Sequence, residues 1–176
     1  MTNINTSNPI NQSPLSGNGY KFVIEKIPNL SYFCQEVNLP SITLGEISMP
    51  TPLTAIALPG DQVTYDPLTV DFLLDNTMSN YVAIHEWIIG LGFPLDNADY
   101  AARLAANTQT GLSDSAKAYS DATLQILDSF NNPIRTIQFV DIVPQTLEAL
   151  TFTSTSQDVT YLIGRVSFRY TYYKFI

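Results

Sequence analysis

The sequence predicts a mainly β fold: two packed antiparallel sheets, arranged as a β-sandwich or a barrel, with one flanking α-helix. Three observations support this prediction. Segments that alternate apolar and polar residues recur along the chain, turn residues separate them, and only one segment has the spacing of a long amphipathic helix. Because helices do not alternate with strands, antiparallel pairing is favoured over a parallel βαβ arrangement.

The chain begins with a polar arm, which we assign to residues 1–18. This segment is rich in Asn, Ser, Pro and Gly and has few large apolar side chains. Such a composition cannot offset the entropy of ordering on its own, so the arm is expected to be disordered or to lie on a neighbouring subunit. A single β domain is predicted to span residues 19–176.

The first strands are expected at 20–25 and 31–39, as a hairpin, followed by a short strand at 42–48. Residues 49–62 contain three prolines, which confine strands to sheet edges or irregular structure. We therefore expect a long loop there. Its apolar side chains would be unfavourable in water, so they are expected to contact another chain.

The clearest strand signal is 68–75, where Phe72 and its alternate neighbours form an apolar face. An amphipathic helix of roughly 12 residues follows, capped by Ser79 or Asn80 and ended by glycines. We expect the strand-to-helix junction to lock the helix onto the sheet. The residues assigned to this junction are Phe72, Asp75, Tyr81 and Trp87.

The second half of the domain begins with an exposed excursion, predicted over residues 95–120 and including a short helix at Ala98–Ala106. Strands are expected at 122–128 and 134–140, and a turn at 143–147. Residues 158–176 predict one long strand or two. The aromatic residues near its end are expected at a strand edge, where they would invite association.

The composition points to covered surfaces. The chain is 45% hydrophobic and 14% charged, and it contains ten Tyr and nine Phe, more aromatic residues than one core requires. Its formal charge of −8 disfavours sequence-reading contact with DNA or RNA. It has no apolar run long enough to span a membrane and no signal peptide, and one cysteine fits a reducing compartment. We expect synthesis in a cytoplasm and no membrane insertion.

No motif for catalysis, cofactor binding or metal binding is present. His85 has no second histidine beside it, and Cys34 is interpreted as a buried small side chain. The acidic pair Asp71 and Asp75 is too far apart on a strand for glycoside hydrolysis. Asp96 and Asp99 are interpreted as helix caps. A thin basic row is interpreted as a solvated face or an intersubunit ion pair; it consists of Arg165, Arg169 and Lys174.

One stretch, LPGDQVTYDPLTVDFLLDNTMSNYVAIHEWIIGLGFP (58–94), resembles the central part of tail tube proteins of contractile-tailed bacteriophages. The shared features are Pro59-Gly60-Asp61, the strand ending at Asp75, Asn80-Tyr81 and Trp87. The resemblance implies hexameric rings that stack into a tube, with DNA as passive cargo in the lumen. It also implies a tail sheath and baseplate or neck proteins as partners, assembly in the host cytoplasm and a final location in the virion tail.

The sequence leaves several alternatives open. The ring could belong to the main tube or to a baseplate or neck. The rival hypothesis is a monomeric β-domain that binds a ligand such as a carbohydrate in a tail fibre or baseplate, since exposed aromatic side chains stack on sugars. In the tube hypothesis, the residues assigned to the oligomer interface are Leu53, Ile56, Leu58, Tyr170, Tyr172, Phe175 and Ile176.

Overall fold

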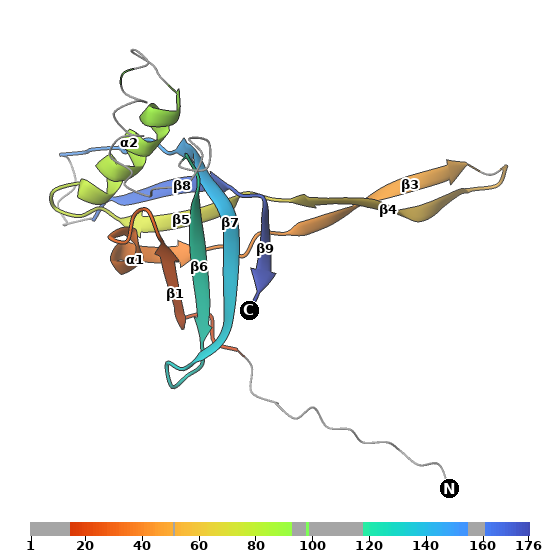
Figure 1. Cartoon of the computed structure of the whole chain (residues 1–176), viewed down its shortest axis with the longest axis horizontal. Coiled ribbons are helices and arrows are strands. Elements are labelled where there is room, and N and C mark those ends of the chain that lie inside the picture. Colours follow the sequence, from red (N-terminus) through yellow and green to blue (C-terminus); the bar gives the residue numbers. More distant parts are fainter. Residues whose placement is uncertain (1–14, 51, 93–97, 99–117, 155–160) are drawn as a thin grey trace, which may run out of the picture.

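The computed structural model describes residues 15–50, 52–92, 98, 118–154 and 161–176, and its strands all pair antiparallel (Figure 1). The mainly β prediction is confirmed. The elements are β1 (Tyr20–Ile24), α1 (Leu30–Phe33), β2 (Cys34–Val37), β3 (Ile42–Pro50), β4 (Ala55–Tyr65), β5 (Leu68–Leu73), α2 (Ser79–Gly92), β6 (Ser120–Leu127), β7 (Pro133–Leu147), β8 (Ile163–Arg169) and β9 (Tyr172–Phe175).

Two sheets share the long strand β7. We call β1-β6-β7-β9 sheet A and β2-β5-β8-β7 sheet B. The strands of the two sheets run in nearly perpendicular directions in Figure 1, an arrangement in which a strand turns the corner from one sheet to the other. Neither sheet closes on itself within the described residues, so the sandwich alternative holds and the closed barrel does not.

The corner of β7 lies at Asp141, which has a positive φ of 56°. The backbone N–H of Asp141 donates to the Asp121 carboxylate at 3.1 Å. The Thr171 hydroxyl donates to the Asp141 carboxylate at 3.4 Å. Beyond the corner, β7 pairs with β8. The turn expected at 143–147 is therefore wrong: Pro144 continues the strand because a register shift beside it relieves the missing donor.

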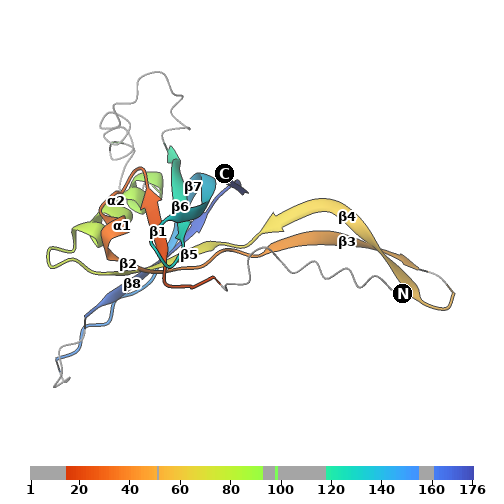
Figure 2. The same cartoon turned by 90° about the horizontal axis from the view of Figure 1, so that it is seen from below.

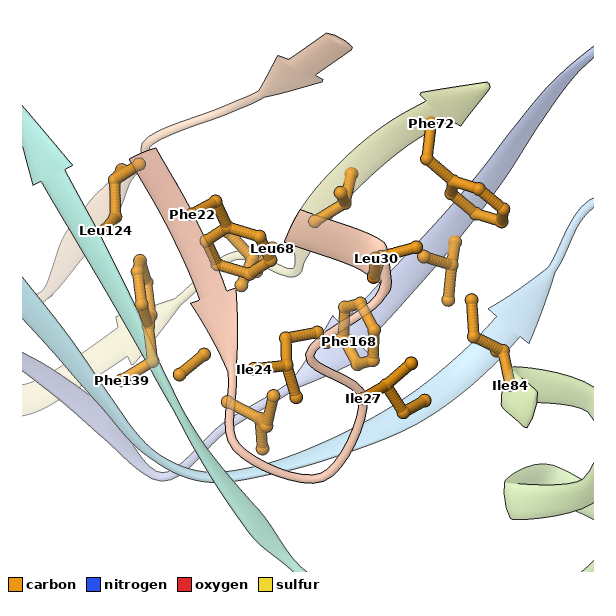
Figure 3. Packing of buried hydrophobic residues seen from close by; sticks show 14 of the residues in the cluster. Phe22, Ile24, Ile27, Leu30, Leu68, Phe72, Ile84, Leu124, Phe139 and Phe168 are labelled. Carbon is orange, nitrogen blue, oxygen red and sulfur yellow. The ribbon is translucent and has the colours of Figure 1, made fainter. Parts of the chain in front are cut away.

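The core fills the space between the two sheets. Phe22 and Ile24 of β1 face Leu68 of β5 and Phe168 of β8, and α1 closes one end with Leu30 (Figure 3). All of these side chains are buried. The period-2 alternation seen in the sequence thus marks the inner faces of strands such as β1, β5 and β8. Burial of these faces is the main favourable contribution to folding.

The junction between β5 and α2 is held by a buried polar residue, Asn80. Its side-chain amide donates to the Leu73 carbonyl at 2.8 Å and its amide oxygen accepts from the Asp75 N–H at 3.4 Å. Asp75 accepts from the hydroxyls of Thr77 and Ser79, and these bonds lower the pKa of its carboxyl. The end of the strand and the start of the helix are therefore bonded to each other.

The hairpin expected from 20–25 and 31–39 is wrong. Residues Leu30–Phe33 form the short helix α1, and β2 pairs with β5 while β1 pairs with β6. The reason is that Ile27 and Leu30 turn into the core, which places β1 and β2 in different sheets. Residues 1–14 of the arm and most of the excursion at 95–120 lie outside the described residues. Within the described part of the chain, no helix has the length and apolarity that a membrane crossing needs.

Trp87 of α2 gives the first test. Its side chain is 1% exposed, its indole N–H donates to the Ala118 carbonyl at 3.0 Å, and its ring lies 6.2 Å from that of Phe168. We expect Trp87→Ala to lower the free energy of unfolding by about 3–5 kcal/mol, because it leaves a cavity between helix and sheet. Urea denaturation followed by circular dichroism measures this.

The control is Val82→Ala, on the exposed side of the same helix, which we expect to change the free energy of unfolding by less than about 0.5 kcal/mol. A loss below roughly 1 kcal/mol for Trp87→Ala would contradict the placement of this helix.

Candidate functional site

The first candidate surface is a long hairpin formed by β3 and β4, which projects far beyond the two sheets and exposes many apolar side chains (Figures 1 and 2). Every residue of β3 is exposed. The pairs Ile47–Leu58 and Met49–Ile56 put four apolar side chains on one side of the hairpin, each between 43% and 58% exposed. Leu53, between the two strands, is 97% exposed.

The loop expected at 49–62 is therefore wrong, because most of it is strand. Prolines are excluded from central strands because they have no backbone N–H to donate to the hydrogen-bond ladder. In a two-stranded hairpin each strand has an open edge, so Pro50 and Pro59 fit there without losing a required bond. The apolar residues Ile56 and Leu58 thus lie on a strand and not in a loop.

The hairpin has a bulge where its strands cross closely. The register shifts between Leu44 and Glu46, and a Cβ on Gly60 would lie 2.7 Å from the Gly45 carbonyl oxygen. Backbone atoms cannot yield as a flexible side chain does, so only glycine fits at position 60. The Pro-Gly-Asp motif of the sequence is this crossing point.

The root of the hairpin continues the β2–β5 ladder. The N–H of Asn38 donates to the Thr69 carbonyl at 3.2 Å, and the side-chain oxygen of Asn38 accepts from the Thr69 N–H at 2.5 Å. The N–H of Asp66 donates to the Ser41 carbonyl at 3.2 Å, and the Ser41 hydroxyl donates to the Asp66 carboxylate. Residues 34–73 therefore form one ribbon, of which half belongs to sheet B and half leaves the body.

The second candidate surface is the pair of open edges of sheet A. Among the described residues, no strand pairs with the outer edge of β1 or of β9. Tyr172 and Phe175 of β9 are exposed, as is Ile176 after it. Unpaired edges that carry exposed apolar side chains favour association with another strand.

Tyr170 occupies a different place from the other predicted interface residues. It lies between β8 and β9, and its ring packs 5.2 Å from that of Phe139 in the core. Burial raises the pKa of Tyr170 to about 12. Its hydroxyl is buried and has no hydrogen-bond partner among the described residues.

The outer faces of the sheets are polar. On sheet B, Arg165 donates two bonds of 2.6 Å to the Asp71 carboxylate, which raises the pKa of its guanidinium further. Arg169 donates to the Gln145 side chain at 3.0 Å. The outer face of sheet A carries Lys21 and Lys174 beside a central group of uncharged residues: Thr123, Gln125, Thr136 and Gln138.

The described residues contain no cluster of His, Cys, Asp and Glu that could hold a metal ion. His85 is exposed on α2. Cys34 is partly buried in β2, and this burial raises the pKa of its thiol to about 11, so it is protonated at neutral pH. Asp71 is in an ion pair with Arg165. The chemistry of these groups serves packing and charge pairing.

Asn80 and Gly60 are the residues whose roles the sequence did not indicate. The sequence identifies Asn80 as a possible cap and as part of the Asn80-Tyr81 feature, but its buried role depends on the Leu73 carbonyl seven residues earlier, which no local pattern indicates. Gly60 was interpreted as part of a loop motif. Each is explained by a backbone group of another segment that approaches within bonding or contact distance.

No protein-family model and no curated protein matches the chain. Solved structures do match it over nearly its whole length. A chain in the baseplate of the anti-feeding prophage has a TM-score of 0.62 at 15% identity and covers 94% of this chain and 97% of its own length. The tube-terminating cap of the same particle has a TM-score of 0.64 at 11% identity, and the match covers 99% of both chains.

A third match comes from the extended sheath–tube complex of the PVC extracellular contractile injection system. Its TM-score is 0.60 at 14% identity, with 94% of this chain and 93% of that chain covered. At these identities the likeness concerns the fold. The tail-tube-like fold predicted from the sequence is therefore confirmed.

The crossing at Gly60 predicts the effect of a single methyl group. We expect Gly60→Ala to displace the hairpin strands, with backbone chemical-shift changes confined to residues 43–48 and 58–63 and a thermal midpoint within about 3 °C of the parent. Gly45→Ala is the matched control, since a Cβ there would be 3.4 Å from its nearest neighbour. If Gly60→Ala leaves the hairpin shifts unchanged, the strands do not cross as closely as described.

Proposed function

We propose that this chain is a structural subunit of a contractile-tail tube, and that six copies form a ring that stacks with others. The observation that carries the proposal is the projecting hairpin, whose apolar side chains have no layer of the described residues against them. The fold, shared with tube, cap and baseplate proteins, supports it. The proposed role is mechanical, with no catalytic step.

Ring closure would follow from the strand directions of sheet A. In the order β1-β6-β7-β9 every neighbour is antiparallel, so β9 runs opposite to β1. A second copy in the same orientation can therefore place its β1 beside β9 and continue the alternation. Six copies contribute four strands each, and a 24-stranded barrel would be about 37 Å or more across at the backbone.

The lumen would be lined by the outer face of sheet A. Sheet B and α2 share the core with the inner face of sheet A, so six copies of them fit only outside the barrel. In that arrangement α2 faces outward, toward a sheath. The apolar face of sheet A would thus lie toward the subunit core, and its polar face toward the channel.

The charge of this lining suits passive cargo. Lys21 and Lys174 are balanced by Asp121 and Glu25 along the same face, and uncharged Thr and Gln side chains lie between them. Phosphate chains are held by an excess of Lys and Arg, which this face lacks. DNA passing through the lumen would therefore meet no strong attraction.

The hairpin would supply the contact with another copy. It carries Glu46 and Asp61 and no basic residue; indeed no Lys or Arg occurs anywhere in residues 27–102. An acidic, apolar projection is expected to dock on a neutral or basic surface of a neighbour. The wider assignments remain part of this proposal: a phage tail, a sheath and a baseplate or neck as partners, and assembly in the host cytoplasm.

Negative-stain microscopy of the purified protein tests the proposal. We expect rings or tubes from the parent chain. Deletion of residues 49–58, which removes the outer part of the hairpin, should leave a folded protein that no longer assembles. Light scattering and circular dichroism measure the two properties separately.

The matched control is Phe130→Ser, which changes a side chain 82% exposed in the β6–β7 turn and should assemble like the parent. Small globules from the parent chain at all concentrations would contradict the tube and favour the carbohydrate-binding alternative. Oligomers that persist after the deletion would show that the hairpin is not the contact.

A further inference from the structure

Three tyrosine rings meet where the hairpin joins the body. Tyr65, the last residue of β4, lies 5.8 Å from the ring of Tyr170 and 5.7 Å from that of Tyr173, and the latter two rings are 6.1 Å apart. Phe139 of β7 supports them from the core, at 5.2 Å from Tyr170 and 5.5 Å from Tyr173. We call Tyr65, Tyr170 and Tyr173 the tyrosine joint.

The joint contacts both strands of the hairpin. Tyr65 belongs to β4 itself. On the other side, the hydroxyl of Tyr173 donates to the carbonyl of Pro40, two residues before β3 begins, at 3.4 Å. Each strand is thus attached to the C-terminal part of the body, which is more than 100 residues away in sequence. These contacts are independent of the hydrogen bonds at Asn38 and Asp66.

The hairpin needs such an attachment if it is to keep one direction. A two-stranded ribbon is marginally stable alone, and this one has no third strand and no layer of the described residues against it. Its backbone bonds at the root hold the two strands to each other. They do not prevent the pair from bending as a unit about the root.

We propose that the tyrosine joint fixes the direction of the β3–β4 hairpin relative to the two sheets before any partner is bound. Offset and edge-to-face aromatic pairs have preferred geometries, so the three rings resist rotation of the ribbon in a way that a hydrogen bond alone does not. Tyr65, Tyr170 and Tyr173 are accordingly positioning residues. This goes beyond the proposed function, since the hairpin can be held in one direction whether or not the subunits assemble into hexameric rings.

A fixed hairpin has a consequence for association. A segment already in its bound direction loses less conformational freedom on docking than one that swings, so more of the contact free energy appears as affinity. The buried hydroxyl of Tyr170 is compatible with this role, because the ring fills the joint while Phe139 packs below it.

Residue-resolved amide hydrogen exchange on the full chain tests the joint. The reporters are the N–H groups of Asn38 and Asp66 at the root. In the parent chain we expect them to exchange at least about tenfold more slowly than the amide of Leu53, which lies between the two strands. Tyr65→Ala removes two ring pairs and should speed exchange of both reporters by about tenfold or more.

Exchange at amides of the two sheets distinguishes a local effect on the tyrosine joint from a general loss of stability. The N–H groups of Leu74 and Glu148, which donate to Leu162 and Arg165 at 3.0 and 2.9 Å, should exchange at the parent rate in the same variant. Tyr173→Phe keeps the ring and deletes only the bond to Pro40, so it should speed exchange at the root by about threefold. Tyr161→Ala, 75% exposed, is the control and should change neither set.

Two results would overturn the proposal. One is root exchange that is unchanged in Tyr65→Ala. The other is an equal rise at root and body amides, which would make these tyrosines ordinary core residues. The variants are compared with the parent at the same amides, so either result can be interpreted whether or not the chain assembles. The negative-stain images described above report on assembly separately.

Discussion

The structure depends on one constraint: a two-stranded ribbon that leaves the body cannot cover its own side chains. From Cys34 to Leu73 the chain runs out and back as a single antiparallel pair, and only the inner half of that pair belongs to a sheet. The outer half has apolar pairs such as Ile47–Leu58 on its surface. Soluble monomers rarely expose such a surface, and this favours the proposed role, in which another molecule covers it.

The same ribbon explains the unusual distribution of charge. All eight basic residues lie outside residues 27–102, and in the described part they lie on the faces and ends of the sheets and near α2. The hairpin therefore cannot satisfy its own carboxylates, whereas the sheets carry cations such as Lys174 that other copies could reach. Low total charge and separated signs both fit a molecule whose surface is largely shared with neighbours.

Local patterns made half of this architecture predictable. Strand β5 and helix α2 were predicted because Val70 and Phe72 alternate with polar residues and Ile84 recurs with Trp87 at helical spacing. The hairpin was missed because Pro50 and Pro59 were interpreted as favouring a loop over an edge strand, whereas both strands of a two-stranded hairpin have an open edge. The pairing of β2 with β5, the corner at Asp141 and the bond from Asn80 to Leu73 depend on contacts between distant segments, which periodicity does not record.

In the proposed assembly, copies of this chain cover each other's edges. A cryo-electron microscopy map of the assembled particle tests this arrangement most directly. We expect β1 of one copy to pair with β9 of the next in a continuous antiparallel barrel, and the Ile47–Leu58 side of the hairpin to be buried against another copy. A map in which both edges face solvent, or a hairpin that contacts nothing, would contradict the claim.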